Sequence, residues 1–473
     1  MSMSVQVATI GGGQREWEGR EWFPPGPQLA VCLSGTKERL ADLTDDELLQ
    51  VAAAARRQTS WAQARELAAI AELTRRRTSE EDSGVEESGD PEYRVLSARE
   101  SVAEEVAVAL TVTGNAAATL VHLAEQLTGP LARTGEALAA GHVDLAKARV
   151  ICDVTESLPG DVVGKVQCVA LEKAPEQTTG QLRRRIKRLA QRLAPEAIEE
   201  RKRDAVRRRR LELWDTPSGT SDLSLCDLAT EDAHAIFNKI TAAANGIKAE
   251  GDPRPLSTVR AELATRLLHG VELPEAVRTL LSQTCDESDA QSPPMGSVSV
   301  LSVTDQGEAI GARLDDESGV ADARLVGLAD EVDRRLNHVR GRVHPRDLPH
   351  AIRQAAGRIR DQLAGARDVA CQGDEECHGS PGYRPPVAMR QEIEARHSRC
   401  VFPTCNQPSR RCDLDHTIPW RPGLTCRCNL APLCRRHHRL KQSPGWRLHQ
   451  IWPGLLIWIT PSGGWYIVRP DRQ

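Results

Sequence analysis

Four potential metal ligands lie close together in the sequence near the carboxyl end of this 473-residue chain. Cys400 and Cys405 form one pair, and Cys434 and His437 form a second pair three residues apart. Tetrahedral structural zinc takes four cysteine or histidine ligands, supplied here as two close pairs. The alternative is a set of free buried cysteines with surface histidines, but two pairs at ligand spacing seldom arise by chance. The spacing therefore predicts a structural Zn2+ site made of Cys400, Cys405, Cys434 and His437.

A second group of residues has the composition of a hydrolytic site. His438 follows His437 directly, and on a helix its side chain would point about 100° away from that of its neighbour. It would then be free to meet Asp415 and His416 from the preceding segment. Hydrolysis of a phosphodiester needs a base to activate water and a cation to offset negative charge. We expect His416 to be the general base. We expect Asp415 and His438 to hold one Mg2+ or Mn2+ ion.

Asn429 lies between His416 and Cys434 in the sequence and has two possible roles. Its amide could orient the His416 ring, or it could brace the loop through hydrogen bonds. Taken alone, an asparagine at such a place is a helix cap or a loop residue. In a regular strand Asp415 and His416 would face opposite sides. They share one site only if the hairpin is irregular there or if the phosphate lies between them.

Together these residues resemble the HNH endonuclease family, which has the ββα-metal fold. The family pattern is a zinc pair, an Asp-His on a hairpin, an asparagine, and a second zinc pair followed at once by a histidine. The matching residues, within about 381–450, are Cys400, Cys405, Asp415, His416, Asn429, Cys434, His437 and His438. The resemblance implies that His416 is the general base and that Asn429 is the middle residue. It also implies that Asp415 and His438 bind the catalytic ion.

The chain departs from that family pattern at two places. His437 stands where a cysteine is commoner as the fourth zinc ligand. The hairpin loop reads Pro-Gly-Leu-Thr at 422–425, where many relatives have Gly-Gly-Pro-Thr. Neither departure removes a proposed catalytic group.

The distribution of charge favours a nucleic-acid substrate. Between Arg396 and Arg447 there are eleven Lys and Arg but only two Asp, whereas the whole chain has a net charge of −4. A basic segment on an acidic chain indicates local contact with phosphate, although a basic run can also be a solvated face. We therefore expect an endonuclease that cuts DNA, with RNA not excluded. The alternative is a zinc-stabilised module that binds DNA without cleaving it.

The last residues of the chain are expected to form a β-meander. Trp446 to His449, Leu455 to Ile459 and Trp465 to Val468 read as strands, and Pro-Gly and Gly-Gly pairs separate them. We expect this meander to cap the metal-binding region. Stacking of nucleic-acid bases on its tryptophans is the weaker alternative.

The rest of the chain is expected to be helical, which makes the fold mainly α. Aromatic residues are only 3% of the chain and five of the nine tryptophans lie in the last 54 residues, so the earlier part must pack Ala, Leu and Val. Separate helices are expected from Thr44, which opens a capping box, and over 61–73, with an acidic loop over 78–93. Further helices are expected within 101–127 and 140–152, a hairpin over 211–226, and a strand over 298–303. The basic helical segment over 181–210 has two balanced interpretations, contact with a nucleic-acid backbone or a solvated face.

The expected domains are a flexible lead-in (1–36), a helical domain (37–280), a linker with a helical connector (281–380) and the nuclease module with its meander (381–473). The helical part resembles a domain of unknown function that precedes HNH modules in a repeat family of actinobacterial proteins. The segments that carry this resemblance are residues 43–49, 60–67 and 141–148. That family is associated with mobile elements, and the resemblance supplies no catalytic residues. With no apolar run of eighteen residues and no secretion signal, we expect a cytoplasmic protein without a membrane span.

Overall fold

The computed structural model describes residues 23–34, 39–83, 96–216, 218–269, 319–365 and 379–471. The fold is mainly helical, with small antiparallel sheets. The chain divides into two compact units. The first contains Met1–Glu156, Gly160–Leu189 and Leu314–Gln473, and the second contains Ser157–Pro159 and Ala190–Arg313.

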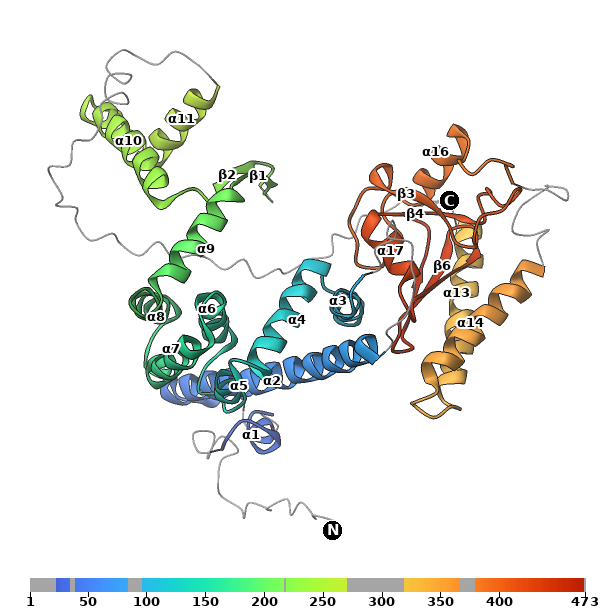
Figure 1. Ribbon diagram of the computed structural model, residues 1–473, viewed down its shortest axis with the longest axis horizontal. Coiled ribbons are helices and arrows are strands. Elements are labelled where there is room, and N and C mark those ends of the chain that lie inside the picture. Colours follow the sequence, from blue (N-terminus) through green and yellow to red (C-terminus); the bar gives the residue numbers. More distant parts are fainter. Residues whose placement is uncertain are drawn as a thin grey trace, which may run out of the picture. The chain divides into compact units, whose positions relative to one another are not determined.

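The amino-terminal part of the first unit is a helical bundle (Figure 1). Its helices are α1 (Pro27–Cys32), α2 (Asp45–Ser83), α3 (Ala98–Leu110), α4 (Gly114–Thr128), α5 (Ala132–Ala139), α6 (Leu145–Thr155), α7 (Gly160–Lys173) and the start of α8 (Thr179–Leu193). Helix α2 contacts α3, α4 and α5, and α4 contacts α3, α5 and α6. Short 3-10 turns lie at Leu40–Asp42 and Ala174–Glu176.

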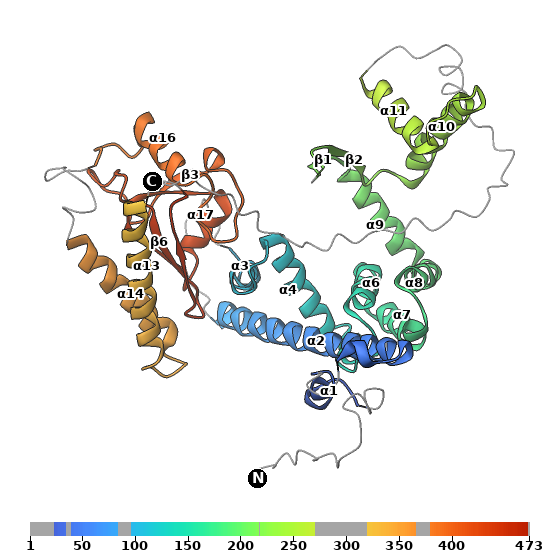
Figure 2. The same cartoon turned by 180° about the vertical axis from the view of Figure 1, so that it is seen from behind.

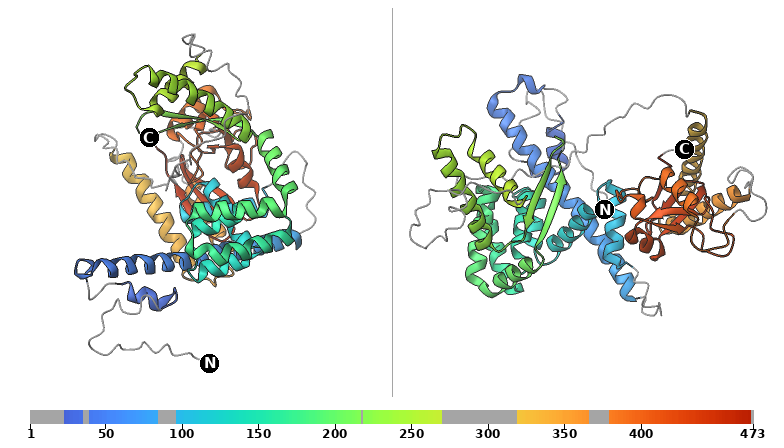
Figure 3. Two further views of the ribbon diagram at one scale, coloured as in Figure 1. Left: turned by 90° about the vertical axis from the view of Figure 1, so that its left-hand side faces the viewer. Right: turned by 90° about the horizontal axis from the view of Figure 1, so that it is seen from above.

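The expectation of two separate helices before residue 83 is wrong, because α2 is a single helix of 39 residues (Figure 3). No glycine or proline interrupts the sequence from Asp45 to Ser83, so nothing in the backbone ends the first helix early. Residues 78–83 of the expected acidic loop are therefore helical, and the rest of that segment lies outside the described residues. The expected capping box is present, since the Thr44 amide donates to Glu47 Oε2 at 2.8 Å and the Glu47 amide donates to Thr44 Oγ1 at 3.4 Å.

Helix α3 is buried along most of its length. A capping box between Ser97 and Glu100 starts it, and every residue from Ser101 to Val108 is buried. One side of α3 packs on α2 and α4. Val108 belongs instead to the same hydrophobic cluster as Phe402, Trp446 and Trp458. Helix α3 therefore lies between the helical bundle and the carboxyl-terminal residues of the same unit.

Two helices and a three-stranded sheet form part of the carboxyl-terminal half of the first unit (Figure 2). Helix α14 (Leu348–Gly365) packs on α13 (Gly319–Arg340) and on the strands β5 (Arg447–Trp452) and β6 (Leu455–Ile459). Strand β7 (Trp465–Val468) completes the antiparallel order β5-β6-β7, so the predicted meander is confirmed. Trp446 and Trp458 are fully buried, which removes them as platforms for base stacking.

The remaining elements of this half surround the predicted metal ligands. Strand β3 (Asp413–His416) pairs antiparallel with β4 (Leu430–Leu433), so that His416 lies opposite Leu430. Helix α16 (Val387–Arg396) contacts β4 and precedes the first cysteine pair. Helix α17 (Arg435–Gln442) follows β4 after one residue and contacts β3, β4 and β5. A 3-10 turn at Ser409–Arg411 leads into β3.

The described residues of the second unit contain the end of α8, a hairpin and the helices α9, α10 and α11. Strands β1 (Arg210–Asp215) and β2 (Ser221–Cys226) pair antiparallel, which confirms the predicted hairpin. Helix α9 (Pro195–Arg207) precedes it, while α10 (Thr230–Ala249) and α11 (Leu256–Leu268) pack together around Ala243, Ala244, Val259 and Leu263. The strand expected over 298–303 lies outside the described residues. Within the described residues, no single helix has the length and apolar character of a membrane span, although α3 and α4 meet the criterion together, bent by 114°.

Candidate metal centre

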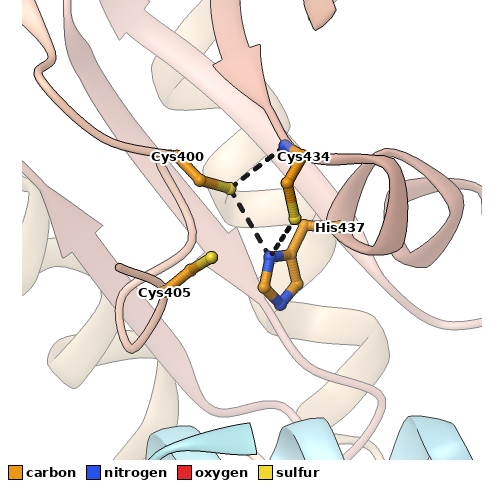
Figure 4. A group of neighbouring side chains, drawn as sticks. All are labelled: Cys400, Cys405, Cys434 and His437. Carbon is orange, nitrogen blue, oxygen red and sulfur yellow. Dashed lines mark hydrogen bonds between the residues drawn. The ribbon is translucent and has the colours of Figure 1, made fainter. Parts of the chain in front are cut away.

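The structure brings the four predicted zinc ligands together (Figure 4). The donor atoms of Cys400, Cys405, Cys434 and His437 all lie within 4.8 Å of one another. Cys400 and Cys405 come from the turn before β3, where the Cys405 amide donates to Phe402 O at 3.0 Å. Cys434 caps the amino end of α17, and His437 lies on its first turn. The turn before β3 thus supplies one ligand pair, and the first turn of α17 supplies the other.

The spacing of these atoms fits a tetrahedral ion. His437 Nδ1 lies 3.2 Å from Cys434 Sγ and 3.5 Å from Cys400 Sγ. Zinc with bonds of ~2.3 Å to sulfur and ~2.0 Å to nitrogen would place such atoms about 3.6 Å apart. Small adjustments would therefore seat an ion among the four donors. Within the described residues this is the one group of three or more cysteine, histidine and acidic ligands close enough to hold a metal.

The four ligands perturb one another strongly when no cation separates them. Hydrogen bonds from Cys400 and Cys405 hold the pKa of the Cys434 thiol far below its usual range. Burial alone would lower the pKa of His437, but hydrogen bonds to Cys405, Cys434 and Glu104 raise it to about 11. Metal binding would replace the protons on these ligands, because a bound cysteine is a thiolate and a bound histidine is neutral.

Packing around His437 fixes the orientation of its ring. Phe402 stacks on it with ring centroids 3.9 Å apart and an interplanar angle of 11°. Its second nitrogen, Nε2, lies 3.4 Å from Oε2 of Glu104, a residue of α3 that is 1% exposed. Glu104 Oε1 also accepts a hydrogen bond from Arg436. Glu104 could not be identified from the sequence, because 333 residues separate it from His437 and no local pattern connects them.

The second predicted group forms a separate cluster on the neighbouring face of α17. Asp415 Oδ1 lies 3.1 Å from His438 Nε2, while Lys441 binds the other Asp415 oxygen and donates to His416 O at 2.6 Å. Asp413, two residues before Asp415 and so on the same face of β3, lies 3.6 Å from His438 Nδ1. Lys441 was missed, although its i, i+3 spacing from His438 puts both on one face of α17.

Charges within this cluster stabilise its ionised forms. Burial would raise the pKa of Asp415, but the hydrogen bond from His438 and the charge of Lys441 bring it below its usual range. The hydrogen bond to Asp415 raises the pKa of His438, and this effect outweighs burial. Two ligands of a Mg2+ ion at ~2.1 Å and 90° are about 3.0 Å apart. The 3.1 Å between Asp415 Oδ1 and His438 Nε2 fits that arrangement.

His416 faces away from the Asp415 carboxylate, as the alternation along β3 requires. Its Nε2 lies 3.0 Å from Thr425 Oγ1, and its ring lies 5.2 Å from that of Tyr383. Thr425 Oγ1 in turn donates to Gly382 O at 2.7 Å. Burial lowers the pKa of His416, more than the Asp415 charge raises it. The imidazole is therefore neutral at pH 7.

Asn429 braces the loop and does not contact the His416 ring. Its Oδ1 accepts from the Ile418 amide at 2.7 Å and from Thr417 Oγ1 at 2.9 Å. Its Nδ2 donates to Leu424 O at 3.0 Å and to Ile418 O at 3.2 Å. The bonds to Thr417 and Ile418 join the two ends of the β3–β4 connection, and the bond to Leu424 holds its middle. The structure therefore supports the second of the two predicted roles.

A cavity of about 590 Å³ opens beside the second cluster. His438 and Asp413 line it, together with four arginines: Arg384, Arg390, Arg435 and Arg439. Arg435 pairs with Asp413 and Arg390 with Glu394, whereas Arg384 and Arg439 have no ion-pair partner within the described residues. Two unpaired guanidinium groups at the mouth of a cavity favour an anionic ligand.

Comparison with known proteins identifies the helical part of the chain. A family described as "Domain of unknown function (DUF222)" matches residues 54–368, which confirms the predicted helical domain of unknown function. The chain is 29% identical to "Uncharacterized protein Rv3776" of Mycobacterium tuberculosis (strain ATCC 25618 / H37Rv), over 94% of this chain and 83% of the relative. It is 27% identical to "Uncharacterized protein Rv2100" of the same strain, over 94% of this chain and 79% of the relative. No solved structure matches the chain.

Proposed function

We propose that this chain, which belongs to the DUF222 family, is a metal-dependent endonuclease that hydrolyses DNA phosphodiester bonds at an HNH-type site. The observation that carries the proposal is the pairing of Asp415 with His438 at 3.1 Å, one strand position from a neutral His416. A purely structural zinc module needs neither a carboxylate–imidazole pair nor a neutral histidine beside it. Zn2+ at the four-ligand cluster would fix the position of α17 relative to β3, as structural zinc fixes the elements of small domains.

The hydrogen bonds of His416 assign its tautomer. Thr425 has one hydroxyl proton, and the 2.7 Å bond to Gly382 O uses it. Thr425 Oγ1 must then accept at its contact with His416, so the proton of the neutral imidazole is on Nε2. The lone pair is left on Nδ1, which makes no hydrogen bond to another described residue. Nδ1 is therefore the atom that takes a proton from the attacking water.

Asp415 and His438 would hold the catalytic ion, Mg2+ or Mn2+. Lys441 occupies one oxygen of Asp415 and leaves Oδ1 for the ion, while Asp413 is within reach of a proton on His438 Nδ1. Such an outer carboxylate keeps the opposite nitrogen free to bind a metal. When bound, the divalent ion offsets charge on the phosphate and on the leaving oxygen.

The arginine-lined cavity supplies contacts for the nucleic-acid backbone. Arg384 and Arg439 are free to pair with phosphates on either side of the scissile bond, and guanidinium groups bind phosphate oxygens in pairs. These contacts read charge and spacing but not the bases, so RNA remains a possible second substrate. The fold alone does not determine which nucleotide sequence is cut.

Cleavage of supercoiled plasmid DNA tests the proposal. Purified full-length protein with Mg2+ or Mn2+ should nick or linearise the plasmid, and His416→Ala should reduce the rate by about 10²–10⁴-fold. His350→Ala, which removes an exposed histidine of α14, is the matched control and should cut at the wild-type rate. Plasmid binding without cleavage by the wild type would favour the DNA-binding alternative. Equal cleavage by wild type and His416→Ala would overturn the assignment of the base.

A further inference from the structure

Glu104 is an acid buried in the helical domain, yet both of its carboxylate oxygens contact α17. The residue is 1% exposed. Its Oε2 lies 3.4 Å from His437 Nε2, and its Oε1 accepts from Arg436 Nε. A buried carboxylate is costly unless charged or hydrogen-bonded partners compensate it. Among the described residues, the partners of the Glu104 carboxylate are Arg436 and His437, more than 330 positions later in the sequence.

The orientation of His437 gives this contact a chemical consequence. Its Nδ1 faces the sulfurs of Cys400 and Cys434, so Nδ1 is the nitrogen that would bind an ion. A metal-bound imidazole is neutral and carries its one proton on the other nitrogen. That nitrogen, Nε2, faces Glu104. The imidazole of His437 thus lies between the Glu104 carboxylate and the cysteine sulfurs.

We propose that Glu104 is a positioning residue of the metal centre, and that the helical domain thereby contributes to zinc binding. The carboxylate accepts the Nε2 proton of His437, fixes the tautomer that leaves Nδ1 free, and makes the imidazole a stronger ligand. Outer carboxylates of this kind typically contribute 10–100-fold to metal affinity. The inference rests on the proposal that the four-residue cluster binds zinc, and it is independent of whether the protein cleaves DNA.

Other contacts of α3 hold Glu104 at this place. Ser101 Oγ accepts from Trp446 Nε1 at 2.8 Å, and Glu105 Oε2 accepts from the Ser462 amide at 3.1 Å. Val108 belongs to the hydrophobic cluster around Phe402 and Trp458. These residues lie at i, i+4 and i+7 of the helix, with Glu104 at i+3, so they share one face. The family match over 54–368 includes this face but ends before the first metal ligand.

The zinc affinity of full-length variants tests the proposal. Glu104→Gln keeps the size of the side chain but replaces the carboxylate, which accepts through two oxygens, with a neutral amide. Glu105→Gln is the matched control, because Glu105 is the next buried acid of α3 and bonds to Ser462, not to a metal ligand. Affinity is measured by competition with a chromophoric zinc chelator. The visible absorption of the Co2+-substituted protein reports ligand geometry separately from stability.

We expect Glu104→Gln to weaken zinc binding by 10–100-fold and to shift the Co2+ absorption bands. Glu105→Gln should bind zinc within twofold of wild type and leave the Co2+ spectrum unchanged, even if it lowers thermal stability. Wild-type affinity in Glu104→Gln, or an equal loss in Glu105→Gln, would overturn the role of Glu104 and leave the zinc site standing. Failure of the wild type to bind zinc would overturn both the zinc site and the role of Glu104, whatever the result of the cleavage assay.

Discussion

His397 provides a quantitative test of how burial controls stability in the carboxyl-terminal residues. It follows the last residue of α16 and is 3% exposed, and its Nε2 has no hydrogen-bond partner among the described residues. Burial lowers its pKa from 6.5 to about 4, against a smaller opposing effect of Asp471. The histidine therefore binds a proton near pH 6.5 in the unfolded chain, but only near pH 4 in the folded chain. The neutral histidine stabilises the fold fully above pH 6.5, and this contribution is lost as the pH falls from 6.5 to 4.

The size of the effect follows from the two protonation equilibria. Relative to high pH, proton binding to His397 in the unfolded chain lowers the free energy of unfolding by about 0.1 kcal/mol at pH 7.5. At pH 5 it lowers that free energy by about 2 kcal/mol. His397→Asn has no titrating group and keeps an N–H donor. The wild type should therefore lose about 2 kcal/mol more than the variant between pH 7.5 and pH 5.

Urea unfolding of both proteins at the two pH values measures this difference, with tryptophan fluorescence as the signal. Trp446 and Trp458 are fully buried in the same region, so their emission should change when it unfolds. Acid also protonates the metal ligands, but that loss is common to both proteins and cancels in the comparison. Equal losses in wild type and variant, within about 0.5 kcal/mol, would refute the assignment of a buried neutral His397.

Two further predictions concern the metal centre and the general base. Removal of zinc with a strong chelator should unfold the region around α17, seen as a loss of helical circular dichroism that added zinc restores, and unchanged ellipticity and melting would contradict the site. Thr425→Val should lower the cleavage rate about tenfold or more, because the valine cannot accept the Nε2 proton of His416, while zinc content stays at the wild-type level. A Thr425→Val protein that cleaves at the wild-type rate would contradict the assigned tautomer.

Local patterns in the sequence were sufficient to predict several elements. The two ligands of each pair, at 400/405 and at 434/437, lie close together because each pair lies on one turn of backbone. The hairpin at β1–β2 and the meander β5-β6-β7 follow from strand alternation and from turn residues such as Gly454, which has a φ of +84°. In each case the interaction that specifies the structure lies within a few residues of the sequence.

Features with a weak local signal, and features that depend on distant packing, could not be predicted. The continuous helix α2 was expected as two helices, because a weakly amphipathic, alanine-rich stretch gives a poor signal of continuity. Glu104 has no local pattern that marks it as a partner of His437. The two possible roles of Asn429 were separated only by the positions of Ile418 and Leu424 across the loop.

The burial of α3 on both sides means that the functional module is not a continuous stretch of sequence. A fragment that began after residue 368 would retain all four metal ligands, yet His437 Nε2, Trp446 Nε1 and the Ser462 amide would lose their acceptors on α3. The structural unit around the metal ligands therefore includes α3, α13 and α14 together with residues 379–471.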